Sequence, residues 1–331
     1  MNITQISVDK FNELAQSEPC ASIYQSSYWS DLMIKKGYEP LFIQYTDDNN
    51  ICVALGMFLL KRDTFISFKP TAHCPYGYLI NYYDKDILKQ FSEDLKEFFK
   101  EKKISKIVIE PNVAFHNGKY TNEAVVKALL ESGYTKSNNL FIYSLDTENH
   151  EEKINAHNFI LKAKEVEEDV LFALTKNSDY LELYETVKPF VTLYAVRPDS
   201  TKTRRKLNDS IKECEKFISE HEDDYKFDEK NSLKMDMIRD RRQSIVALDR
   251  FEDKHGVEGV LTLACVCKYA GKYNILFTIN NDTDNFFEAE NALVDKLVKD
   301  AIKQGCHEIY SLKPFAYAEK VELLGEYTYK F

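Results

Sequence analysis

The stretch from residue 258 to residue 312 constrains the fold of this chain more than any other part of it. It begins with two apolar, β-prone runs that are separated by a turn signal at Gly271. A helical spacing of apolar residues follows and ends at Gly305, where a helix C-cap favours a residue that readily adopts positive φ. A short apolar run, 308–312, completes the stretch. This order predicts a β-hairpin, a helix and a further strand.

The first part of the chain shows the same mixture of strand and helix patterns. Strands are predicted at 40–45, 51–60, 64–68, 104–109 and 140–145, and helices at 8–17, 29–37, 86–100 and 124–131. Strands and helices that alternate in this way make one α/β unit of the usual domain size.

Between residues 147 and 200 the pattern is less regular. Helices are predicted at 154–165 and 180–187, and a strand at 190–196. A chain of 331 residues has room for about two domains.

Residues 201–255 form a highly charged segment without glycine or proline. Its apolar positions step by four and three residues, through Leu207, Ile211, Cys214, Ile218 and His221, which is a heptad-like seam. The acidic stretch 222–229 interrupts the pattern before a second helix begins. The segment therefore predicts an antiparallel two-helix arm. Arg239, Arg241 and Arg242 on its second helix leave two alternatives, a solvated surface and a face that contacts RNA.

The bulk composition describes a soluble globular protein, because 44% of the residues are hydrophobic and 30% are charged. A net charge of −10 argues against a general nucleic-acid binder but leaves room for a local basic site. The N-terminus lacks a secretory signal pattern, and no apolar run approaches the roughly 20 residues that cross a bilayer. Seven cysteines form an odd set without paired spacing. We therefore expect a cytoplasmic protein with reduced thiols and no metal site.

Common catalytic signatures are absent from the sequence. It contains no Gly-rich phosphate loop, no Gly-x-Ser-x-Gly elbow, no His-Glu-x-x-His motif and no Cys-x-x-Cys pair. The Arg/Gln-x-x-Gly-x-Gly/Ala loop, with which acyl-CoA N-acetyltransferases hold pyrophosphate on helix N-terminal amides, is also missing. No cofactor is therefore expected.

Several landmarks occur in an order that resembles a known family. They are Tyr24-Gln25 with the helix that follows, Pro75 to Tyr83, Ile107 to Pro111, the charged arm, and the tail from Gly325 to Lys330. In this order the chain resembles the Fem family of peptidoglycan-bridge aminoacyltransferases. The resemblance implies two acetyltransferase-like (GNAT-like) domains with an inserted coiled-coil arm. The first domain would comprise residues 1–146 plus 313–331, the second 147–200 plus 256–312, and the arm 201–255.

The resemblance also implies an activity and its residues. The donor would be aminoacyl-tRNA, and the acceptor would be the stem peptide or bridge of a lipid-linked or UDP-linked muropeptide. The implied catalytic residues are Lys330, which would stabilise the oxyanion or the tRNA 3′ end, and Glu110, which would orient or deprotonate the amine. The substrate-binding candidates are Tyr329, Lys35, Lys36, Tyr76 and Tyr78.

Two other functions stay open at this stage. Met33 stands where the family usually has a phosphate-contacting lysine, and the chain ends one residue after Lys330, so a catalytically silent relative that binds the precursor or a protein partner is the main alternative. An acyl-CoA transferase is the more remote one. Contact with the inner membrane face and association of two copies through the arm are further expectations.

Overall fold

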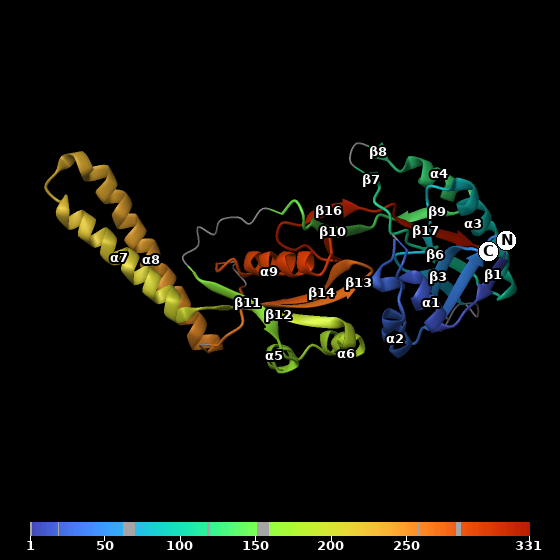
Figure 1. The fold of residues 1–331 in the computed structure, drawn as a ribbon, viewed down its shortest axis with the longest axis horizontal. Coiled ribbons are helices and arrows are strands. Elements are labelled where there is room, and N and C mark those ends of the chain that lie inside the picture. The colour runs from blue at the N-terminus through green and yellow to red at the C-terminus, as the bar shows by residue number, and fades with distance from the viewer. Residues whose placement is uncertain are drawn as a thin grey trace.

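The computed structural model describes residues 2–18, 20–61, 70–117, 120–150, 159–256, 258–282 and 286–331. These residues form two large β-sheets with helices on their faces, and a helical hairpin that projects from the second sheet (Figure 1). A short two-stranded ribbon joins β7 (His116–Asn117) to β8 (Tyr120–Thr121). The strand predicted at 64–68 lies outside the described residues.

The first sheet lies at the end of the molecule that carries both chain termini (Figure 1). Its strand order is β1 (Asn2–Gln5), β2 (Glu39–Thr46), β3 (Cys52–Lys61), β4 (Thr71–Cys74), β6 (Lys106–Ile109), β17 (Glu326–Lys330) and β9 (Thr135–Asn138), with β5 (Leu79–Ile80) paired to β3. The β4–β6 pair is parallel, and the other pairs of this sheet are antiparallel.

Helices cover the two faces of the first sheet unequally. One face packs against α3 (Lys85–Glu101) and α4 (Glu123–Glu131) in a core that includes Phe58, Phe91, Phe99 and Ile107. On the other face, α1 (Val8–Ala15) and α2 (Ser27–Lys35) pack over β2 and β3, whereas β4, β6 and β17 carry polar side chains there. Helix α3 forms because its apolar residues recur every three or four positions and Asp84 caps its N-terminus by accepting from the Ile87 amide at 3.1 Å. The first sheet and these helices are called the first unit below.

The second sheet contains the strands of residues 258–312, the stretch with the clearest sequence pattern. Its strand order is β11 (Leu161–Val166), β12 (Val191–Pro198), β13 (Thr262–Tyr269), β14 (Lys272–Asn280), β15 (Glu308–Ser311), β10 (Phe141–Asp146) and β16 (Glu319–Glu322). Helix α9 (Ala289–Lys303) packs on one face, and α5 (Glu168–Leu174) and α6 (Ser178–Val187) pack on the other. The predicted hairpin, helix and strand are thus confirmed, and Gly305 after α9 has a φ of +69°. This sheet with its helices is called the second unit.

Two strands belong to a different sheet from the one that the sequence predicts. The predicted first domain, 1–146 plus 313–331, includes β10 and β16, but β10 pairs with β15 and with β16 in the second sheet. Strand β17 does lie in the first sheet, between β6 and β9. A strand has the same alternation of side chains whichever sheet it joins, so its own sequence does not reveal the partner.

The segment between the sheets corrects a helix prediction. Residues 161–166, which overlap the end of the helix predicted at 154–165, form the edge strand β11, which pairs with β12. Lysine and glutamate favour a helix by propensity, but an edge strand also carries charged side chains on its exposed positions. Residues 154–158 lie outside the described part. The helix predicted at 180–187 and the strand at 190–196 are confirmed as α6 and β12.

The arm consists of α7 (Ser200–Glu220) and α8 (Asp228–His255), linked by the 3-10 turn η3 (Tyr225–Phe227). The two helices pack along their length and extend away from both sheets (Figure 1). The predicted seam faces inward, where Leu207, Ile211 and Cys214 are buried. At its base, Arg204 forms ion pairs with Asp249 and Glu252. Among the described residues, none of the helices combines the length and apolar character that a membrane crossing requires.

Candidate functional site

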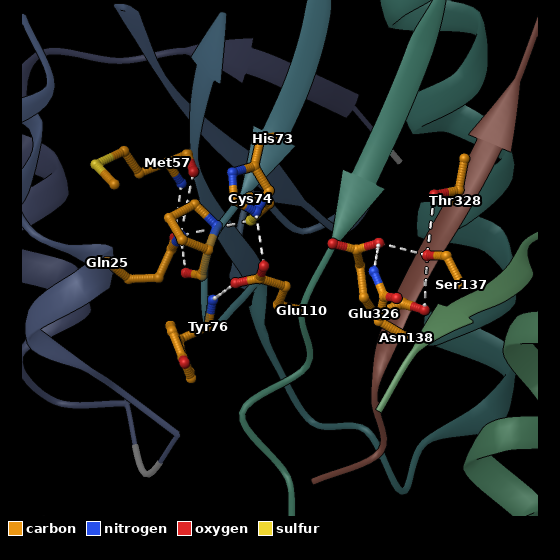
Figure 2. A network of polar contacts seen from close by, with 11 residues as sticks. Gln25, Met57, His73, Cys74, Tyr76, Glu110, Ser137, Asn138, Glu326 and Thr328 are labelled. Carbon is orange, nitrogen blue, oxygen red and sulfur yellow. Dashed lines mark hydrogen bonds and ion pairs between the residues drawn. The ribbon is translucent and has the colours of Figure 1, made fainter. Parts of the chain in front are cut away.

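The buried amide of Gln25 fixes the backbone around the candidate site. Gln25 ends the short 3-10 helix η1 (Ile23–Gln25) and has no exposed surface. Its Nε2 donates to the carbonyls of Met57 at 3.1 Å and Pro75 at 2.7 Å, and its Oε1 accepts from the Met57 amide at 2.8 Å (Figure 2). One side chain therefore ties β3 to the segment that leaves β4.

Glu110 is the first residue after β6, at the end of the parallel β4–β6 pair. Its amide donates to the Cys74 carbonyl at 3.1 Å, which continues the pairing by one bond. Its Oε1 lies 3.0 Å from Nε2 of His73, and its Oε2 accepts from the Tyr76 amide at 3.4 Å (Figure 2). The side chain of Glu110 is 12% exposed and that of His73 is 32% exposed.

This arrangement prepares a carboxylate to accept a proton. The Tyr76 amide donates to one carboxylate oxygen and His73 Nε2 contacts the other, so the side chain is held in one orientation, and partial burial keeps competing water away. Burial, and then the negative charge of Glu110, raises the pKa of the Tyr76 phenol, so that phenol is neutral at physiological pH. The same two causes raise the pKa of the Cys74 thiol. Glu110 is therefore the group of this cluster best suited to act as a general base.

The site lies where the two units meet. The Tyr76 ring is 4.7 Å from the Tyr24 ring, and Tyr24 belongs to a buried cluster that includes Cys267 and Tyr269 of β13. The Tyr269 hydroxyl donates to the Gln25 carbonyl at 3.4 Å. The positions of Gln25 and Glu110 thus depend on contacts from the second unit.

A cavity of about 910 Å³ lies between the units. Residues that line it include Asn81, Tyr82, Tyr83, Asn112 and His116 from the first unit and Ser144, Lys272 and Tyr310 from the second. Asn112 lies two residues after Glu110 in the chain. The cavity therefore extends to the end of β6 at which Glu110 lies. Its volume is in the range of small-molecule sites.

The structure does not bring Lys330 and Glu110 together. Lys330 ends β17 and lies opposite Lys106, whereas Tyr327 lies opposite Ile109, next to Glu110. Four residues of extended strand, about 13 Å, therefore separate the two side chains along the sheet. Lys330 is exposed. The antiparallel register of β17 on β6, which the sequence does not show, causes this separation.

Tyr329 lies on the opposite face of the first sheet from Glu110. Its ring is 5.9 Å from the Tyr134 ring, and Nζ of Lys96 lies 4.7 Å above it. Neighbouring residues of a strand face opposite sides of the sheet, and Lys330 takes the side of Lys106. Tyr329 therefore does not flank Glu110 as the resemblance implied.

Tyr78 does not line a groove, contrary to the prediction. It is fully buried, its hydroxyl lies 3.1 Å from Ser92 Oγ, and its ring stacks on Tyr82 at 5.9 Å. Of the other binding candidates, Tyr76 is partly exposed at the site. Lys35 donates to Thr186 Oγ1 at 2.8 Å and so links α2 to α6, while Lys36 is exposed at the C-terminal cap of α2.

The sequence alone does not reveal the His73–Glu110 contact. Alternation along 71–74 places His73 on the face opposite Ala72 and Cys74, and this was the available signal. The sequence does not show that β4 pairs in parallel with β6, because the two strands lie on either side of α3 in the chain. Gln25 was identified as a landmark by resemblance, but its role as a backbone anchor follows from the structure.

Comparison with solved structures places this fold in a class. The chain is similar to the crystal structure of FemX, with a TM-score of 0.70 and 15% identity over 100% of this chain and 98% of that one. It is also similar to a tandem GNAT protein from the clavulanic acid biosynthesis pathway, with a TM-score of 0.49 and 9% identity over 99% and 98% of the two chains. The second likeness is too weak to carry weight. The likeness to FemX confirms the predicted fold class.

The family follows from the sequence itself. A model described as the FemAB family matches residues 6–176, which is more than half of the chain. The chain therefore belongs to the FemAB family, as its resemblance to the Fem aminoacyltransferases predicted. Comparison with curated proteins gave no match. The family assignment supports acyl transfer in peptidoglycan bridge formation as the general activity.

Proposed function

We propose that this protein transfers an amino acid from aminoacyl-tRNA to an amine on the stem peptide or bridge of a lipid-linked or nucleotide-linked muropeptide. The observation that carries the proposal is Glu110. It is a largely buried carboxylate at the end of a parallel strand pair, with His73 and the Tyr76 amide on its oxygens. A cavity of about 910 Å³ between the two units has Asn112, two residues after Glu110, in its lining and is large enough for part of such an acceptor.

The reaction needs a positioned amine and a proton acceptor rather than a protein nucleophile. The amine nitrogen attacks the ester carbonyl carbon, a C–N bond forms, and the bond from that carbon to the ribose oxygen breaks. Glu110 takes the proton that the amine loses, and the ribose oxygen takes up a proton and leaves as a hydroxyl. His73 and Tyr76 hold the carboxylate in place, which lowers the entropic barrier to the attack.

An acyl-CoA donor is disfavoured by two carboxylates of the chain itself. The helix that follows the central strand of an acetyltransferase would bind pyrophosphate on its N-terminal amides. In the first unit Asp84 accepts from the Ile87 amide at the start of α3. In the second unit Asp282 accepts from the Phe287 amide at 3.1 Å and the Ala289 amide at 3.2 Å at the start of α9. At the N-terminus of each of these two helices, a carboxylate of the chain therefore already accepts a hydrogen bond from a backbone amide.

The deciding experiment is transfer of a labelled amino acid from charged tRNA to lipid-linked and nucleotide-linked muropeptides. Glycyl-, alanyl- and seryl-tRNA serve as donors, and free amino acid with uncharged tRNA is the control. We expect labelled muropeptide only with charged tRNA, and none with acetyl-CoA.

The same preparation also distinguishes the proposed enzyme from the main alternative, a catalytically silent binding protein. If no donor supports transfer while the muropeptide binds measurably, the protein is a catalytically silent binding protein. Transfer from acetyl-CoA, or equal transfer without charged tRNA, would contradict the proposed donor.

A further inference from the structure

The two carboxylate oxygens of Glu110 have different neighbours. Oε2 accepts a hydrogen bond from the Tyr76 amide at 3.4 Å, and Oε1 lies 3.0 Å from Nε2 of His73 (Figure 2). A backbone amide does not release its proton near neutral pH, whereas the side chain of histidine both takes up and releases protons in this range. Of these two neighbours, His73 is therefore the one able to exchange a proton with Glu110.

Nε2 of His73 is a buried nitrogen that makes no hydrogen bond with the residues that the structure describes. The side chain as a whole is nevertheless 32% exposed, so the exposed part of the ring lies away from Glu110. A buried polar atom without a hydrogen bond costs free energy, and native proteins contain few of them. A proton placed between Oε1 of Glu110 and Nε2 of His73 would satisfy both atoms at their present distance.

His73 also lines a hollow of about 300 Å³ on the polar face of the first sheet. Of the Glu110–His73 pair, His73 belongs to the lining and Glu110 does not. At about 30 Å³ for each water, the hollow has room for several water molecules. Its charged residues include Lys61 and Lys106, whose ammonium groups oppose a lasting positive charge on His73. A proton that reaches this ring is therefore readily passed on to water.

The proposed transfer requires Glu110 to accept two protons in one turnover. A lysine-type amine has a pKa of about 10.4, so the acceptor arrives as an ammonium group and must lose a first proton before its nitrogen can attack. Once the C–N bond has formed, the nitrogen loses a second proton, which balances the one that the ribose oxygen takes up as the C–O bond breaks. Transfer therefore releases one net proton, and Glu110 must lose it before it can accept the second.

We propose that His73 is the proton exit of this site. The inference rests on the proposed function, because the ammonium group of the acceptor supplies the proton. The first proton moves from the ammonium nitrogen to Glu110 and then from Oε1 to Nε2 of His73, which leaves a carboxylate beside an imidazolium. The imidazolium gives a proton from its other ring nitrogen to water in the hollow, and a turn of the partly exposed ring restores the starting arrangement. The proton thus leaves while the acceptor stays in place at Glu110.

The test compares two muropeptide acceptors, one with the natural amine and one with an aminooxy group at the same position. The aminooxy nitrogen is neutral at pH 7, so its transfer releases no net proton. Transfer from charged tRNA is measured for the wild-type chain, His73→Ala and His73→Gln, and urea unfolding verifies the fold of each. We expect both variants to lose about 10- to 100-fold in rate with the amine and at most about twofold with the aminooxy acceptor.

Imidazole in the buffer gives a second readout. It fits the space that the missing ring leaves in His73→Ala and should restore transfer to the amine in proportion to its concentration. The wild-type rate should not respond. The matched control is His307→Ala, because His307 also lies 2.8 Å from a carboxylate oxygen, that of Glu148, but on the exposed surface of the second unit. This control should keep the wild-type rate with both acceptors.

The outcomes separate this inference from the proposed function. Equal losses with the two acceptors would show that His73 only positions Glu110 and would overturn the inference. Transfer to the amine at the wild-type rate by His73→Ala or His73→Gln without imidazole would overturn it as well. If the wild-type chain transfers no amino acid from any charged tRNA, the proposed function is wrong and the inference falls with it.

Discussion

Oε1 of Glu110 lies 3.0 Å from Nε2 of His73, across the parallel strands β6 and β4. This contact joins residues 37 positions apart and holds the carboxylate at the junction of the two units. It is the structural basis of the proposed chemistry, and the first prediction concerns it.

Glu110→Gln should reduce the rate of amino-acid transfer by about 10²- to 10⁴-fold, because the amide keeps the shape of the side chain but does not accept the amine's proton. The measurement is single-turnover transfer from charged tRNA, together with urea unfolding to verify the fold. Glu97→Gln is the matched control, since Glu97 is exposed on α3 and pairs with Lys100. A transfer rate within twofold of the wild-type rate would remove Glu110 from the mechanism.

Gln25→Ala should lower the free energy of unfolding by about 2–4 kcal/mol, because the Met57 amide and the Pro75 carbonyl lose their buried partner. The midpoint and slope of urea denaturation measure the change. Gln90→Ala is the control, because Gln90 makes an exposed hydrogen bond to Asp94. Equal stability of the two variants would show that Gln25 does not anchor β3 to the segment after β4.

Tyr78→Phe should destabilise the protein by about 1 kcal/mol without changing the KM for the muropeptide, because the hydroxyl is fully buried and contacts Ser92. Unfolding and steady-state transfer are measured on the same preparation. A raised KM at unchanged stability would restore Tyr78 as a binding residue.

Lys330→Gln should stabilise the isolated protein by about a few tenths of a kcal/mol, since it removes the like-charge pair with Lys106. The gain should shrink in 1 M salt (a Debye length of about 3 Å), because screening weakens the repulsion. Lys89→Gln, at an exposed position of α3, is the control and should have no such salt dependence. A loss of stability in Lys330→Gln at low salt would contradict the repulsion.

Asp199→Asn should destabilise the protein at pH 7, and the effect should begin to shrink as the pH falls below about 3.8 and disappear only below the lowered folded-state pKa. A hydrogen bond from Lys162, and then one from the Lys202 amide, lowers the pKa of Asp199 from 3.8. A lowered folded-state pKa adds stability above the unfolded value, and this stability is lost as the pH falls through the folded value. Asparagine can still cap α7, so the difference isolates the charge. Urea unfolding of both proteins at pH 7, 5 and about 2 measures it, and a gap independent of pH over this range would exclude this origin.

The features that the sequence predicted correctly depend on local patterns. The hairpin, helix and strand within 258–312, the amphipathic helix α3 and the two helices of the arm each have a period that their own residues define. The order of landmarks such as Tyr24-Gln25 also led to the right family. These local patterns can be recognised without knowing which segments lie side by side in the folded protein.

The features that the sequence did not predict depend on pairing between distant segments. Strand β10 joined the second sheet, and residues 161–166 became an edge strand, because their backbone groups found partners there. The predicted site changed for the same reason: the register of β17 on β6 separates Lys330 from Glu110 and turns Tyr329 to the other face.

The sequence by itself thus determined the hairpin, helix and strand of 258–312, helix α3, the arm and the family, because periodicity and motif order are properties of the chain. The tertiary structure alone decided which side chains share the site. The contact of His73 with Glu110, and the row that joins Lys61, Lys106 and Lys330, exist because strands from distant parts of the chain are neighbours in one sheet. Strand order and register are set by packing across the whole unit, and a one-residue shift would place each of these side chains on the opposite face.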